Sequence, residues 1–376
     1  MSVANVSWVA VLLPDLRPGG AEGMRVKMAY EWIARGCDVE FVLRQASGEL
    51  FHQLPDRVSV VDFGASRVRR SFGPLLRYLR DARPDVLLVA MWPLTAIAPL
   101  AAKLAGFRGR VVVSEHSAQS LAYRHKGRVH SSALRVSTWL GYRLADVRIG
   151  VSSGVADDMA SLSRMSREAI TVQYNPAARG LAHPGVSVLP PELEGVSSPR
   201  ILAVGTLKAV KRFDVAIEAF ARLPASLGAT LCIVGEGQER QALQAKIDAF
   251  GVNGRVLLLG YRADTAPWYA NADLFVLSSD YEGFGNVIVE ALEHGVPVVS
   301  TDCPSGPREI LEDGKYGRLV LVGDADALAS AMLESLQSQH DHAALKARAQ
   351  DFAVDKVADQ YLDLLLPGWR EASSKA

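Results

Sequence analysis

Residues 273–300 read DLFVLSSDYEGFGNVIVEALEHGVPVVS and carry the strongest indication of fold in this chain. An apolar run of strand length at 273–278 leads through a glycine-containing loop into an apolar helical segment, and a second apolar run follows at 296–300. Strand, helix and strand in this order form the βαβ unit of a parallel sheet. The loop therefore follows the carboxyl end of a strand, where glycine admits a ligand close to the backbone and a new helix offers free N–H groups to a phosphate.

Two carboxylates flank this loop, eight positions apart in the sequence. Glu282 stands in the loop beside the expected anion site, and Glu290 lies about one turn into the helix. A carboxylate at either place suits paired sugar hydroxyls, because hydroxyls are neutral hydrogen-bond donors. The alternative is that two glutamates stand at this spacing by chance, since glutamate is common in helices.

Residues 278–310 closely resemble family-four retaining glycosyltransferases, also called glycosyl transferases group 1, and weaker similarity extends over nearly the whole chain. The resemblance implies the GT-B fold, an α/β architecture with two Rossmann-like doubly wound domains facing a central cleft. It also implies an enzyme, a retaining hexosyltransferase. Its donor would be a nucleotide diphosphate sugar, expected to be UDP-linked. Its acceptor would be a glycan or a lipid-linked sugar in surface polysaccharide, lipopolysaccharide or glycoconjugate biosynthesis.

The same resemblance assigns roles to residues of the opening segment. Glu282 would hold hydroxyls of the transferred sugar, and Glu290 would hold those of the ribose. Phe284, Gly285 and Asn286 would contact the donor where the helix begins. No side chain is clearly placed as a nucleophile, so the departing phosphate oxygen would itself help to deprotonate the acceptor hydroxyl on the same face of the sugar.

A cationic loop, 205–212, follows the expected strand 200–204. Cations here could neutralise the negative charge of a leaving diphosphate, or the loop could simply be a solvated basic segment. Lys211 matches a lysine of the family, and we expect it to stabilise the diphosphate. Thr206 occupies the place of the family's usual arginine, so Lys208 or Arg212 is expected to supply a second positive charge.

Other loops at strand ends carry weaker signals. Gly19 and Gly20 lie between the first expected strand and helix, and without the third glycine of a dinucleotide fingerprint they could form an ordinary turn. The resemblance places them near the donor phosphates and the acceptor. It also implies that His116, alone past a strand end, orients the transferred sugar, and that Tyr261 and Arg262 contact the base.

Charge is divided unevenly between the halves of this 376-residue chain. The net formal charge is zero, but residues 1–185 carry +9 and residues 186–376 carry −9. The basic half could face an anionic lipid surface or a phosphate-bearing acceptor, or the two halves could attract each other. Two segments mix cations with large apolar residues, at 67–80 and 123–128, and each could be a membrane contact or a solvated helix face.

Cysteine spacing and hydropathy indicate which other classes of protein are not expected. The three cysteines are scattered, which predicts neither a disulfide framework nor a metal site, and a cytoplasmic protein without cofactor or metal is expected. No secretory signal peptide is expected at the start. The uncharged segment 86–102 contains two prolines and predicts a strand and a helix rather than a membrane span. Association with the inner membrane face would then be peripheral, and nucleic acid is not an expected partner.

Strand and helix patterns alternate in both halves, which predicts two doubly wound parallel sheets. The expected domains are an acceptor-side domain at 1–180 and a nucleotide-sugar domain at 181–356, joined by a segment rich in Pro, Gly and Ser. The resemblance implies that the last segment, 357–376, crosses back to the first domain. Apolar periodicity predicts one long helix over 343–366.

Two other functions remain open on the sequence. A GT-B phosphorylase or sugar epimerase would share the fold, although residues 278–310 match neither as well. A noncatalytic relative that binds a sugar nucleotide as a sensor or assembly partner is favoured by the loss of the usual arginine at Thr206. Donor hydrolysis or transfer by the purified protein distinguishes the enzyme from the sensor.

Overall fold

The computed structural model describes residues 6–179 and 188–373, and the chain divides into two compact units. Unit 1 comprises Met1–Pro176 and Val354–Ala376, and unit 2 comprises Ala177–Ala353. The boundaries expected from the sequence, at 180 and 356, lie a few residues further along the chain. Residues 180–187 of the predicted linker fall outside the described residues.

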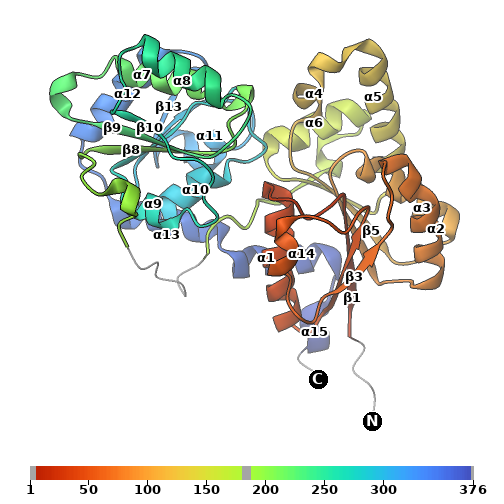
Figure 1. Cartoon of the computed structure of the whole chain (residues 1–376). Coiled ribbons are helices and arrows are strands. Elements are labelled where there is room, and N and C mark those ends of the chain that lie inside the picture. The colour runs from red at the N-terminus through yellow and green to blue at the C-terminus, as the bar shows by residue number, and fades with distance from the viewer. Residues whose placement is uncertain (1–5, 180–187, 374–376) are drawn as a thin grey trace. The chain divides into compact units, whose positions relative to one another are not determined.

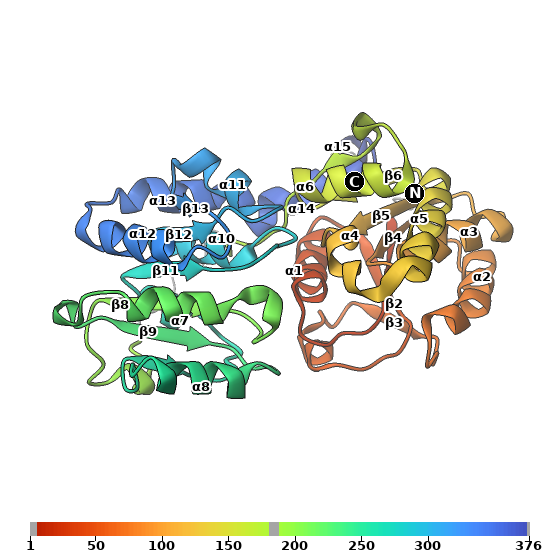
Figure 2. The same ribbon diagram turned by 90° about the horizontal axis from the view of Figure 1, so that it is seen from above.

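Unit 1 is an all-parallel sheet covered by helices on both faces. Its strands are β1 (Trp8–Leu13), β2 (Asp38–Leu43), β3 (Ser59–Asp62), β4 (Val86–Ala90), β5 (Arg110–Glu115), β6 (Val147–Gly150) and β7 (Thr171–Val172). Its helices are α1 (Gly20–Ala34), α2 (Phe72–Asp81), α3 (Leu94–Ala105), α4 (Gln119–Ala122), α5 (Gly127–Leu144), α6 (Ser153–Ser163), α14 (Val354–Leu365) and α15 (Trp369–Ser373). The strand order is β3-β2-β1-β4-β5-β6-β7. Helices α1 and α14 pack together on one face, and α2, α3 and α5 cover the other (Figures 1 and 2).

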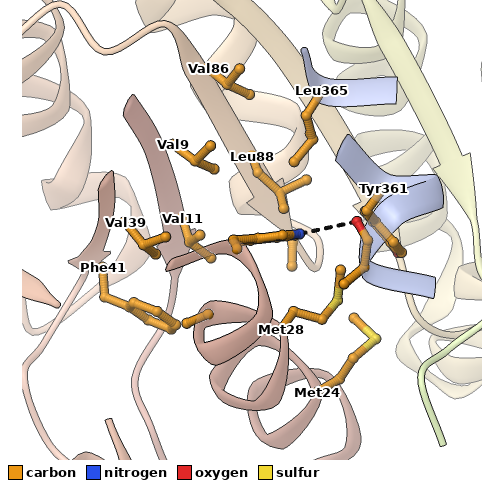
Figure 3. Packing of buried hydrophobic residues seen from close by; sticks show 14 of the residues in the cluster. Val9, Val11, Met24, Met28, Val39, Phe41, Val86, Leu88, Tyr361 and Leu365 are labelled. Carbon is orange, nitrogen blue, oxygen red and sulfur yellow. Dashed lines mark hydrogen bonds between the residues drawn. The ribbon is translucent and has the colours of Figure 1, made fainter. Parts of the chain in front are cut away.

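The main core of unit 1 lies between its sheet and the pair α1 and α14. Every second residue of the central strands points to this face, as strand geometry requires. Figure 3 shows these strand residues facing two methionines of α1 and two side chains of α14: Val9, Val11, Val39, Phe41, Val86, Leu88, Met24, Met28, Tyr361 and Leu365. Helix α14, close to the C-terminus, therefore completes the core of the unit that contains the N-terminus.

Unit 2 repeats this architecture with six parallel strands. Its strands are β8 (Arg200–Val204), β9 (Thr230–Val234), β10 (Val256–Leu258), β11 (Leu274–Leu277), β12 (Val298–Thr301) and β13 (Arg318–Val320). Its helices are α7 (Phe213–Ala221), α8 (Arg240–Ala249), α9 (Ala266–Ala270), α10 (Asn286–Glu293), α11 (Pro307–Ile310), α12 (Ala325–Gln337) and α13 (His342–Ala349). Figure 1 shows α7, α8 and α12 on one face of the sheet and α9, α10 and α13 on the other.

The strand order of unit 2, β10-β9-β8-β11-β12-β13, reverses direction between β8 and β11. Neighbouring strands of a doubly wound sheet send their connections to opposite faces at such a point, and ligands bind beyond the carboxyl ends of the strands there. The loops after β8 and β11 are the ones that contain the cationic segment 205–212 and the glycine-containing segment 278–285. The topology thus brings the two strongest sequence signals to the same edge of one sheet.

The prediction of one long helix over 343–366 is wrong. The structure divides this segment into α13 and α14, separated by a short 3-10 turn, and the two helices belong to different units. Ala353 has extended backbone and forms an isolated parallel bridge with Ala178, while Phe352 is buried. Periodicity marks the apolar face of each helix, but it does not record the change of neighbour between the two helices.

The uncharged segment 86–102 forms β4 and the first part of α3, as the prolines indicated. Within residues 6–179 and 188–373, none of the helices has the length and apolar character required to cross a membrane.

Candidate active site

An ion pair stands at the centre of the candidate site in unit 2. The ammonium Nζ of Lys211 donates to both carboxylate oxygens of Glu282, at 2.7 and 2.9 Å. The hydroxyl of Ser279 donates to the same carboxylate at 2.6 Å. The Glu282 side chain is only 10% exposed and that of Lys211 is 23% exposed, so the pair is partly shielded from water.

The two loops that carry this pair are joined by their backbones. Asp280 N–H donates to the carbonyl of Val210 at 2.8 Å, and the hydroxyl of Ser278 donates to the carbonyl of Lys211 at the same distance. Glu282 N–H donates to the carbonyl of Pro304, in the loop after β12. Three strand-end loops are therefore held in one arrangement, which fixes the carboxylate and the ammonium without help from a ligand.

A thiol lies next to this pair but is not reactive. Burial, followed by the nearby charge of Glu282, raises the pKa of Cys303 to about 12. A thiol with so high a pKa stays protonated at neutral pH, and only the thiolate is a nucleophile. Cys303 is therefore a packing residue of the site.

The glycine turn leads directly into α10. Gly285 is the N-cap residue of this helix and has φ +101°, a conformation that favours glycine. The positive end of the helix dipole of α10 therefore lies at this turn. Glu290 lies one turn further, where its Oε2 accepts a hydrogen bond of 2.9 Å from the phenol of buried Tyr269. The ring of His294 stacks on Tyr269, which fixes that phenol.

In unit 1, His116 follows β5 and contacts a buried cation. The guanidinium of Arg25 is fully buried in α1, its Nη2 lies 3.5 Å from His116 Nε2, and it sits over the ring of Tyr361 at 4.8 Å. No carboxylate forms an ion pair with Arg25 in the described part of the chain. The hydroxyl of Ser114 lies 3.0 Å from the same ring nitrogen.

This environment sets the protonation of His116. Because a guanidinium can only donate hydrogen bonds, Nε2 faces Arg25 as an acceptor, and the neutral ring carries its proton on Nδ1. Burial first, and the Arg25 charge second, hold the pKa of His116 well below its ordinary value. His116 is therefore a neutral imidazole at physiological pH, suited to orienting a polar ligand rather than to carrying charge.

Glu115 anchors the segments around His116. Its buried carboxylate accepts hydrogen bonds from Gln119 of α4 (2.7 Å), Tyr142 of α5 (2.9 Å), the backbone N–H of Trp92 (3.3 Å) and the hydroxyl of Thr95 in α3. Burial raises its pKa to about 7, against the opposing effect of these donors. One carboxyl thus ties three helices to the end of β5.

Known proteins are similar to this chain in sequence and in architecture. The profile of Glycosyl transferases group 1 matches residues 198–338, and that of Glycosyltransferase Family 4 matches residues 18–177. A Campylobacter jejuni protein, N-acetylgalactosamine-N,N'-diacetylbacillosaminyl-diphospho-undecaprenol 4-alpha-N-acetylgalactosaminyltransferase, is 31% identical over 271 residues, which are 71% of this chain and 72% of that protein. The chain belongs to the family-four glycosyltransferases.

Two further comparisons agree with this membership. The lipopolysaccharide core biosynthesis glycosyltransferase LpsE of Rhizobium meliloti is 37% identical over 173 residues, and the matched part is 45% of this chain and about half the length of LpsE, 50%. The crystal structure of HepE from Anabaena, in complex with UDP and glucose, aligns with TM-score 0.77 and 23% identity over 96% of this chain and 99% of that one. The fold is therefore GT-B, and the relatives include a glycosyltransferase of lipopolysaccharide core biosynthesis.

The contacts of Arg212 and Lys208 show which of the two can supply the second positive charge to a ligand. Arg212 donates to both oxygens of Asp214 and to Asp280, so two carboxylates already hold it. Lys208 is exposed, has no ion pair in the described ranges, and lines a cavity of about 290 Å³ together with Arg212. Thr206 is exposed beside it. Lys208 is the cation that remains available to a ligand.

Other family positions differ in what they can offer a ligand. The side chain of Phe284 is buried against Phe352, so only its backbone can meet a donor. Tyr261 is exposed, whereas Arg262 pairs with Glu192 at 2.5 Å.

Gly19 and Gly20 stand at the start of α1, as the sequence indicated. A Cβ on Gly19 would lie 2.2 Å from a carboxylate oxygen of Glu22, so the side chain of Glu22 folds back over this loop. Burial raises the pKa of Glu22. The carboxyl of Glu22 is therefore part of this loop.

Sequence reasoning missed Ser279, Tyr269 and Arg25. Ser279 lies within the matched segment 278–310, three residues before Glu282, but it was not singled out. Tyr269 stands in no motif, and only the packing of α9 against α10 brings it to Glu290. Arg25 did carry a signal, because Ala21, Arg25, Met28 and Trp32 follow the spacing of a buried helix face. A cation on that face predicts a buried charge that requires a partner.

Proposed function

We propose that this chain is a retaining hexosyltransferase that moves a hexose from a UDP-linked donor to a glycan or lipid-linked acceptor in surface polysaccharide biosynthesis. The observation that carries the proposal is the Lys211–Glu282 ion pair, which three loops hold at the point where the strand order reverses. Helix α10 begins directly after the loop that contains Glu282. The named acceptor of the Campylobacter jejuni relative, a diphospho-undecaprenol-linked sugar, supports the class of acceptor.

The chemistry follows from where charge develops. When the bond between the anomeric carbon and the diphosphate breaks, both electrons leave with the phosphate oxygen, and negative charge grows on the diphosphate. Lys211, the exposed Lys208 and the N–H groups at the start of α10 would stabilise that charge. Such groups act more strongly on the transition state than on the bound donor, so their loss should lower turnover more than donor affinity.

The carboxylates would position the donor rather than react with it. Glu282 would accept hydrogen bonds from hydroxyls of the sugar, and Glu290, already held by Tyr269, would accept them from the ribose. The neutral His116 would orient the transferred sugar. The departing phosphate oxygen would take the proton of the acceptor hydroxyl on the face that it leaves, which retains the anomeric configuration.

We further propose that the reaction needs no metal and takes place at the inner face of an anionic membrane. Lys211 and the exposed Lys208 place two ammonium groups in the loop after β8, which supports cationic side chains as the means of stabilising the diphosphate. Peripheral attachment would give access to a lipid-linked acceptor without a membrane-spanning segment.

The proposal is tested by incubating the protein with a panel of nucleotide sugars and lipid-linked acceptors. We expect transfer from one donor, with the anomeric configuration of the donor kept in the product as determined by NMR. Lys211→Ala should abolish most turnover, and Lys315→Ala, which removes an exposed lysine of unit 2, should not. An inverted product would overturn the retaining mechanism.

Donor binding without any transfer would instead identify a noncatalytic sugar-nucleotide sensor. That second function is favoured by the threonine at position 206, where the family usually has an arginine. Calorimetric titration with the donors of the same panel measures binding independently of transfer.

A further inference from the structure

Helix α5 of unit 1 exposes an apolar face that nothing in the described chain covers. The exposed fractions are 86% for Val129, 67% for Val136, 45% for Trp139 and 37% for Leu140. These residues lie three, four and seven positions apart, so they share one face of the helix. Isolated exposed apolar residues are ordinary on a protein surface, but four on one helix face are a patch that indicates a binding surface.

The orientation of α5 is fixed by its opposite side. Leu134, Thr138 and Tyr142 are buried there against neighbouring helices, chiefly α3 and α6. Gly141 permits the closest approach, because a Cβ on it would lie 2.6 Å from the Cα of Ala96 in α3. The helix cannot rotate its exposed residues inward without losing this packing.

The charges carried by α5 and by the segment before it have a single sign. Between Glu115 and Asp146 the sequence has five cations, at 124, 126, 128, 135 and 143, and no carboxylate. Arg128 and Arg135 are exposed along one flank of the apolar face. The guanidinium of Arg143 lies 4.8 Å from the ring centre of Trp139, where it combines charge and apolar surface at one point.

The segment 67–80 has cations of the same sign but a different surface. Leu75 and Leu79 of α2 are buried, and none of the large apolar side chains of this segment is exposed. Cations without apolar residues can attract an anionic surface but cannot anchor in it. Of the two basic segments that the sequence singled out, the one that leads into α5 is therefore the better docking surface.

We propose that α5 and the turn before it form a lipid-docking surface, which seats unit 1 on an anionic bilayer. The apolar face of Val129, Val136, Trp139 and Leu140 would enter the headgroup region, and the surrounding cations would contact lipid phosphates. Charge complementarity selects this partner, since an acidic lipid surface matches five cations and no anion. The purpose of the docking, access to a lipid-linked acceptor, rests on the proposed function.

The test is co-sedimentation of the full chain with vesicles made of equal parts phosphatidylglycerol and phosphatidylcholine, compared with phosphatidylcholine alone. We expect binding to the anionic vesicles that high salt weakens. Val129→Ser with Val136→Ser should lower the partition coefficient on the order of tenfold, because the inserted apolar area is lost. Arg128→Ser with Arg135→Ser should lower it by a similar factor at low salt.

Matched controls separate docking from folding and from catalysis. Leu321→Ser, at an exposed apolar position of unit 2, should leave vesicle binding unchanged. The α5 variants should keep the parent's thermal unfolding and its turnover with a water-soluble acceptor, while turnover with a vesicle-bound acceptor falls. If the α5 variants lose vesicle binding but the parent protein shows no transferase activity, the docking surface is upheld and the proposed function is refuted.

Three outcomes would overturn the docking surface. The first is equal binding to both kinds of vesicle, and the second is binding that the α5 variants do not alter. The third is a parent protein that forms a dimer in solution and becomes monomeric in Val129→Ser with Val136→Ser. That last result would show that a second copy, and not a bilayer, covers this face.

Discussion

Replacing Glu282 by Gln isolates the contribution of the central ion pair. The substitution preserves the shape of the side chain but removes its charge, which leaves the ammonium of Lys211 without a counter-charge in a partly buried place. Removing one partner of a fully buried pair costs about 3–5 kcal/mol, and of an exposed pair about 0.2–1 kcal/mol. With side-chain exposures of 10% and 23%, the expected loss in the unfolding free energy of unit 2 is about 2 kcal/mol.

The assay is a double-mutant cycle of Glu282→Gln and Lys211→Met. Native-state hydrogen exchange locates the change in unfolding free energy within unit 2, where both residues lie. We expect the double variant to be more stable than the sum of the single losses predicts, by about 1–2 kcal/mol, because each single variant leaves a charge or a polar group unpaired.

A matched pair on the same unit serves as the control. Lys315 lies 2.9 Å from Glu312, but their side chains are 63% and 39% exposed. Lys315→Met should therefore leave the unfolding free energy of unit 2 almost unchanged. If Glu282→Gln and Lys211→Met prove additive, or cost no more than the control, the pair does not hold the two loops and the electrostatic argument for the site fails.

Four further changes test other parts of the structure. Tyr269→Phe should weaken donor binding by about fivefold in calorimetric titration, since Glu290 loses one neutral hydrogen-bond donor; unchanged affinity would exclude a role for this phenol. Denaturant titrations should show the parent losing stability relative to Glu115→Gln as the pH rises from 4.5 to 7. The reason is that the folded Glu115 carboxyl, with a pKa of about 7, keeps a proton that the unfolded carboxyl releases, so the slope is at most about 1.4 kcal/mol per pH unit. A difference between the two proteins that does not depend on pH would contradict this. Arg25→Met should raise the pKa of His116 in an NMR titration, and no rise would mean that burial alone lowers it. Transfer should continue in excess chelator; loss that one divalent ion restores would refute a metal-free reaction.

The fold was predictable because its signals are local. Apolar runs of strand length and the glycine turns between them indicated two sheets, although not the short edge strands β7 and β13, and residues 273–300 alone indicated the parallel architecture. The prediction failed at Ala353, where two helices with similar periodicity belong to different units. A hydrophobic pattern records that a face is buried but does not record which partner buries it.

The candidate site was predictable only in part. Lys211 and Glu282, 71 positions apart, were each identified by the family pattern, but only the adjacency of β8 and β11 makes them an ion pair. Tyr269 could not be inferred, because its hydrogen bond to Glu290 depends on how α9 packs against α10. Partners that meet through tertiary packing leave no spacing in the sequence.

The position of α14 has a consequence for synthesis of the chain. Unit 2 is an insertion whose two ends, at Ala178 and Ala353, are bridged to each other, and the residues that complete the core of unit 1 follow it. A chain that emerges from the ribosome N-terminus first can therefore finish unit 2 while the α1 face of unit 1 still lacks Tyr361 and Leu365. The first unit to be translated is the last to be completed, and a nascent chain stopped at residue 353 would display that apolar face to chaperones.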